Sequence, residues 1–135
     1  MNYIKIAKNV FLISSIYDLV LGILFFLFYK PVFNFLNITI PSHPEYLQMS
    51  AAFVAVLGIG YFFIYRNIAR NRDLWKLGIL YKITYSLLIF YYYFILSTAN
   101  ITFLYFAFID VVFVALFLML YGKVYTSDNN NNNNA

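Results

Sequence analysis

The sequence predicts an all-α fold, an integral membrane four-helix bundle with both termini in the cytoplasm. Hydrophobic residues make up 64% of the 135 residues and charged residues only 10%, whereas soluble proteins have about 25% charged residues. Four stretches are long enough to cross a hydrocarbon core, which takes about 20 apolar residues. Basic residues gather at one end of these stretches. Length, composition and charge asymmetry therefore point to the same architecture.

The predicted spans lie within a single domain, residues 1–125, and cover residues 10–29, 47–65, 77–96 and 101–121. The runs IFYYYFIL and FVALFLML in the last two spans are apolar all round, whereas the surface helix of a soluble bundle has a polar face. Lys5 and Lys8 give the first span a start like that of a signal peptide. Its apolar part is about twice as long as expected for one, and no small-residue cleavage site follows. We expect it to stay as a helix.

The orientation follows from the basic residues at the span ends. One side of the predicted bundle carries seven of them: Lys5, Lys8, Arg66, Arg70, Arg72, Lys76 and Lys123. The other side carries Lys30 alone. Because Lys and Arg near span ends are retained in the cytoplasm, we expect an N-in/C-in protein of the plasma membrane, the bacterial inner membrane. Basic residues at span ends predict contact with the lipid bilayer and no nucleic-acid partner.

The first loop, KPVFNFLNITIPSHPE, is the only connection long enough to have structure of its own. It holds all three prolines, so it cannot be one regular helix, although VFNFLNI suits an amphipathic turn. The sole histidine, His43, has only Glu45 nearby as a further ligand, and no metal site is expected. Without cysteine, disulfides and thiolate sites are excluded. The asparagine-rich tail, residues 126–135, is predicted to be disordered.

Each span carries one stripe of small or polar residues at helical spacing. Small and polar residues let helices associate in lipid through close packing and hydrogen bonds, because the hydrophobic effect does not drive helices together there. The stripes are Ser14–Asp18–Gly22, Ala51–Ala55–Gly58, Gly78–Lys82–Ser86 and Ala107–Asp110–Val114. All three charges within the predicted spans lie on these stripes, so we expect them to face the bundle interior.

Lys82 stands inside the apolar run LGILYKITYSLLIFYYY. A charge at the membrane centre costs about 2.5–3.5 kcal/mol on insertion scales, so it normally has a partner. At about 1.5 Å per residue, Lys82 lies roughly 7.5 Å inside its span, Asp110 roughly 16 Å and Asp18 roughly 12 Å. The lysine stem extends further, so the ammonium can reach either carboxylate of a neighbouring helix. Asp110 is the favoured partner and Asp18 the second.

One ammonium between two carboxylates leaves an extra negative charge, so we expect a shared proton or cation. The predicted intramembrane polar cluster is Lys82, Asp110 and Asp18, and its expected lining is Tyr81, Tyr85, Ser86 and Ser14. Three interpretations of Lys82 stay open. It snorkels to the cytoplasmic interface, it forms an inert packing pair, or it serves a ligand or a proton.

Several motifs resemble small bacterial four-helix membrane proteins of the DoxX-like group. They are LGIGY at Leu57–Tyr61, the basic loop Arg66–Lys76, the GxxxK of Gly78–Lys82 and DVVFVALF at Asp110–Phe117. The resemblance runs from the first span to Tyr121 and implies a compact four-helix bundle, with the lysine and the fourth-helix acid of the group at Lys82 and Asp110. Some members are associated with quinone-linked oxidoreductases, so a quinone is the one cofactor that the resemblance suggests, while the residues themselves leave the cofactor unknown. Asp18 has no counterpart in these motifs.

These observations favour a non-catalytic multi-pass membrane protein, a subunit or accessory of a larger membrane complex, respiratory or quinone-linked. The alternative is a small transporter or a quinone- or lipid-binding protein that uses the Lys/Asp cluster and works as a homo-oligomer. An enzyme is not expected, because the sole histidine lies in the first loop and no Ser–His or Cys–His set can form. A cavity beside the charges favours ligand binding, and a tight, dry pair favours a structural role.

Overall fold

The computed structural model describes residues 2–132, and for residues 126–132 it describes the backbone alone. Within this range the chain forms five α-helices and no strand. The helices are α1 (Tyr3–Leu27), α2 (Tyr29–Phe35), α3 (Pro44–Arg66), α4 (Arg72–Phe90), which continues as the π-helical turn η1 (Tyr91–Ile95), and α5 (Ile101–Asn132). Four of them, α1, α3, α4 with η1, and α5, are long and apolar enough to cross a membrane.

The helices α1, α3 and α4 begin earlier than the apolar stretches that predict them, whereas α5 begins at residue 101 as predicted. The first apolar stretch predicts a start at residue 10, but α1 begins at Tyr3, where the Asn2 side chain accepts a hydrogen bond from the Lys5 N–H at 3.1 Å. This contact satisfies one of the N–H groups that a helix leaves unpaired at its start. Hydrophobicity thus predicts the part of a helix that lies in the hydrocarbon core, whereas the capping residue sets where the helix begins.

The first loop contains the short helix α2, as its apolar run permits. Pro31 lies in the first turn of α2, where the missing N–H of proline has no helical partner to lose. The helix stops before Asn37, which has a positive φ of 54°, a conformation that asparagine tolerates better than most residues. Phe33 is buried, so α2 packs its aromatic side chain against the bundle.

The backbone of α5 continues past the last predicted span and ends at Asn132. The disorder of the asparagine-rich tail, residues 126–135, stays a prediction. An established helix gains one hydrogen bond for each added residue, and asparagine lowers helix propensity only modestly. The predicted disorder of residues 133–135 lies outside the described residues.

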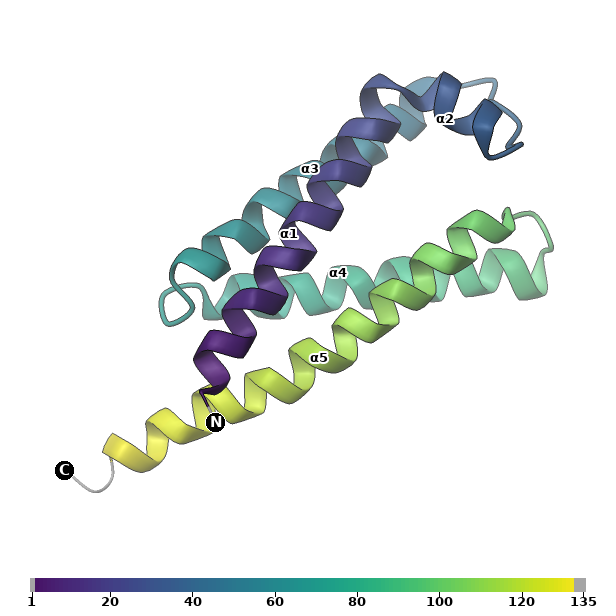
Figure 1. Cartoon of the computed structure of the whole chain (residues 1–135). Helices are drawn as coiled ribbons and strands as arrows, with labels where there is room; N and C mark the ends of the chain where they lie inside the picture. The colour runs from purple at the N-terminus through teal and green to yellow at the C-terminus, as the bar shows by residue number, and fades with distance from the viewer. Residues whose placement is uncertain (1, 133–135) are drawn as a thin grey trace.

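The four long helices form two antiparallel hairpins, α1 with α3 and α4 with α5 (Figure 1). The hairpins meet near the chain termini and diverge toward α2 and η1 (Figure 1). Glycine allows α1 and α3 to pack closely, since a Cβ at Gly22 would lie 2.6 Å from the backbone nitrogen of Ala55. The Ser15 hydroxyl also donates to the Gly58 carbonyl at 2.7 Å. The backbones of α1 and α3 therefore approach each other closely within the first hairpin.

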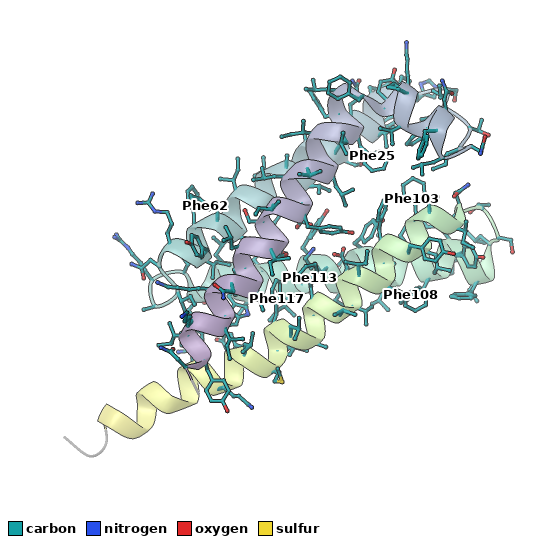
Figure 2. The ribbon with its side chains drawn as sticks, viewed as in Figure 1. Phe25, Phe62, Phe103, Phe108, Phe113 and Phe117 are labelled. Atoms are coloured by element: carbon teal, nitrogen blue, oxygen red, sulfur yellow. The ribbon has the colours of Figure 1, made fainter. Side chains whose placement is uncertain are left out.

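Aromatic side chains fill the end where the hairpins meet (Figure 2). This aromatic core consists of Phe11, Tyr61, Trp75, Phe113 and Phe117. Phe11 stacks on Phe117 at 4.4 Å between ring centroids and meets the edge of Trp75 at 4.7 Å. Tyr61 donates from its hydroxyl to the Gly78 carbonyl at 3.1 Å. These contacts hold the two hairpins together at this end.

Candidate functional site

Three charged side chains meet near the middle of α1, α4 and α5. Lys82 Nζ lies 3.1 and 3.2 Å from the two carboxylate oxygens of Asp18 and 2.6 Å from Asp110 Oδ1. Lys82 is 0% exposed, Asp18 2% and Asp110 5%. We call Asp18, Lys82 and Asp110 the charge triad. It brings together all three charges that the sequence places in the spans, and the ammonium lies between both carboxylates instead of extending toward a helix end.

Aromatic rings surround the ammonium of Lys82. Its Nζ lies 5.6 Å from the ring centroid of Tyr17, 5.4 Å from that of Tyr61 and 5.2 Å from that of Phe113. Cations are attracted to ring faces within about 6 Å, and more strongly when desolvated. The rings and the two carboxylates therefore offset the loss of water around the buried charge.

A pocket of about 260 Å³ lies between the two hairpins and reaches the two carboxylates of the charge triad. It extends from the middle of the helices toward α2, on the side where the hairpins diverge (Figure 1). Its wall consists of Tyr17, Asp18, Leu21, Gly22, Phe25, Leu47, Ser50, Ala51, Val54, Tyr81, Tyr85, Ile89, Phe103, Phe106 and Asp110. Apolar cavities of about 150 Å³ already bind benzene, so this space can hold part of a small molecule.

Phenylalanine side chains gather at the α2 end of the pocket. Figure 2 shows Phe25 of α1 and Phe103 of α5 on the facing sides of the two hairpins, with ring centroids 6.4 Å apart. Phe33 of α2 meets the edges of both rings, at 5.8 and 6.4 Å. The pocket thus lies between this phenylalanine cluster and the charge triad, and the aromatic core follows beyond the triad.

The expected lining residues divide into two pairs. Tyr81 and Tyr85 lie on the pocket wall. Ser86 is buried between helices, where its hydroxyl donates to the Ala107 carbonyl at 3.2 Å. Ser14 is also buried, and its hydroxyl has no hydrogen-bond partner among the described residues. The two serines therefore belong to the helix packing and the two tyrosines to the pocket.

Sequence reasoning did not identify the phenylalanine side chains of the wall. Phe25 follows Asp18 by seven residues, and Phe106 and Phe103 precede Asp110 by four and seven. Residues at these spacings share a helix face. Extending the two acidic stripes by one more turn toward the first loop would have found all three phenylalanines.

The site combines compensated charges with an open space beside them. Among the described residues, no group of three or more His, Cys, Asp or Glu side chains is placed to hold a metal ion. His43 instead forms an exposed pair with Glu45 at 3.0 Å, at the start of α3. The pocket offers carboxylate oxygens, tyrosine hydroxyls and apolar rings to a ligand.

The DoxX-like resemblance stays a prediction from the motifs quoted above. Comparison of the chain with family models, with curated proteins and with solved structures finds no match.

Proposed function

We propose that this chain is an integral membrane protein that binds a lipophilic small molecule between its two hairpins. The observation that carries the proposal is the pocket, which leaves about 260 Å³ of space next to two buried carboxylates. Ligand sites are typically concave and apolar, with a few polar groups that orient the ligand. A purely structural ion pair would need no such space beside it.

The proposed orientation is N-in/C-in in the bacterial inner membrane. Its support is the clustering of basic residues near the end where the hairpins meet, at the start of α1, between α3 and α4, and near Lys123. Positive residues at span ends are retained in the cytoplasm. In this orientation the aromatic core lies in the inner half of the bilayer and the pocket in the outer half.

Cysteine labelling tests the orientation, because the chain has no cysteine of its own. In intact cells, an impermeant thiol reagent is expected to modify Ser42→Cys in the first loop. It is expected to spare Lys5→Cys and Arg70→Cys until the cells are opened. Modification of Arg70→Cys but not Ser42→Cys in intact cells would invert the orientation.

The binding proposal is tested by native mass spectrometry of protein released from its own membrane. We expect one lipophilic molecule to be retained by the unaltered chain and lost from Val54→Trp, because Val54 lines the pocket and the indole would fill it. Val56→Trp is the matched control on the same helix, since Val56 is 61% exposed and lies outside the pocket wall. Equal retention by both variants would contradict the proposal.

The same preparation bears on the predictions about partners. A subunit or accessory role in a respiratory or quinone-linked complex predicts stoichiometric partner proteins in mild detergent. A homo-oligomeric transporter predicts a second copy of the chain. Repeated recovery of a single copy with its ligand would contradict both of these arrangements and leave the binding proposal standing.

A further inference from the structure

The charge triad contains two acidic side chains and one basic side chain. Its two carboxylates, Asp18 and Asp110, face the single ammonium of Lys82. Among the described residues that line the pocket, no other side chain of Asp, Glu, Lys, Arg or His is present. With both carboxylates ionised, the pocket therefore ends on one uncompensated negative charge. Such a charge in an apolar site favours a positive partner.

The hydrogen bonds of the triad also favour a positively charged ligand. Lys82 donates three hydrogen bonds to the carboxylates, which is the full capacity of an ammonium. Both oxygens of Asp18 accept one of them, but only Oδ1 of Asp110 does. Asp110 lines the pocket and keeps acceptor capacity for a ligand. The lysine has no donor left for an anionic one.

The walls next to the triad suit the same type of ligand. The rings of Tyr17, Tyr81 and Tyr85 line the pocket beside the two carboxylates. The faces of aromatic rings attract ammonium groups, including quaternary ones, and the attraction grows when water is absent. The same faces and carboxylates repel an anion. Toward α2 the wall becomes apolar, with Phe25, Phe103 and Phe106.

We propose that the ligand of this pocket is a lipophilic cation, an amine or quaternary ammonium group on an apolar chain. Asp110 receives the positive group, the tyrosine rings flank it, and the apolar chain lies toward the phenylalanine cluster. This inference rests on the proposed binding function and adds the charge and shape of what is bound.

The test places a single cysteine in the pocket and measures how probes slow its reaction with a membrane-permeant thiol reagent. Val54→Cys lines the pocket, and Val56→Cys, on the exposed face of α3, reports general effects of each probe on the bilayer. The protein is held in zwitterionic lipid nanodiscs. The probes share an eight-carbon chain and differ in the head group: octyltrimethylammonium, octanol and octanoate.

We expect octyltrimethylammonium to protect Val54→Cys at a concentration about tenfold lower than octanol. Octanoate should not protect it, and none of the probes should protect Val56→Cys. Adding Asp110→Asn to Val54→Cys should remove the advantage of the cation and leave protection by octanol unchanged. Lys82 and Asp18 still form a neutral pair in this variant, so we expect it to fold. If the variant does not fold, the comparison of the three probes on Val54→Cys alone tests whether the pocket prefers a cation.

The outcomes separate the two proposals. Protection of Val54→Cys by octanol or octanoate at the same concentration as the cation would overturn the cation proposal and keep the binding function. An Asp110→Asn variant that folds and keeps the full preference for the cation would also overturn the role of Asp110. Absence of protection by all three probes would overturn the binding function itself.

Discussion

Replacing Lys82 with methionine is expected to lower the free energy of unfolding by about 3–5 kcal/mol, because removing one partner of a buried ion pair leaves an uncompensated charge. Here it would leave two carboxylates, since Asp18 and Asp110 both contact the Lys82 ammonium. Methionine has a similar length and fills the space without replacing the charge. Unfolding by sodium dodecyl sulfate in mixed micelles, followed by the circular dichroism of the helices, measures the loss.

Variants of the two acids make the prediction specific to charge. Asp110→Asn keeps the Lys82–Asp18 pair and should cost much less than Lys82→Met. The double variant Lys82→Met with Asp110→Leu should stay destabilised, because it leaves the Asp18 carboxylate alone. Adding Asp18→Leu should recover much of the loss, since apolar replacement of a whole buried ion cluster is often nearly neutral. If the single losses simply add, the three residues do not act as one cluster.

Replacing Gly22 with leucine is expected to cost about 1–3 kcal/mol or more, the usual cost of overpacking. Even a Cβ at Gly22 would lie 2.6 Å from the Ala55 nitrogen and 2.8 Å from the Ala51 carbonyl oxygen. These are backbone atoms of α3, so the hairpin would have to separate to admit a side chain. The melting temperature in detergent should fall accordingly.

Gly122→Leu is the matched control, because a Cβ at Gly122 would meet nothing within 4 Å beyond its chain neighbours and the nearby backbone of its own helix. Leucine is also the better helix former by several tenths of a kcal/mol, so this variant should be neutral or slightly more stable. Equal destabilisation by the two substitutions would mean that a general effect of the added leucine side chain, and not the contact between α1 and α3, lowers the stability.

The four long helices and the meeting of the charges follow from the sequence because both depend on local patterns. Apolar length predicts a helix that can cross a membrane, and helical spacing puts Asp18, Lys82 and Asp110 on faces that carry small residues. A charge that cannot reach water must find a partner. These local patterns are enough to predict that the three residues meet.

The pocket could not be predicted in the same way. The pocket exists because α1 and α3 pack through Gly22 and Gly58, whereas the two hairpins diverge toward α2 (Figure 1). The angle between hairpins depends on side-chain contacts far apart in the chain, such as Phe11 on Phe117. Helical spacing says which face a residue occupies but does not say whether a neighbour fills the space in front of it.

The charge triad joins helices that are synthesised at different times. Asp18 precedes Lys82 by 64 residues and Lys82 precedes Asp110 by 28. At about 5–20 residues per second, Lys82 is synthesised roughly 3–13 s after Asp18. During this interval α1 and α3 can already pack against each other. Translation of α4 then completes a neutral pair, and α5 brings the second carboxylate last. The triad thus has one acid for its one base once α4 is made, and α5 adds the second carboxylate.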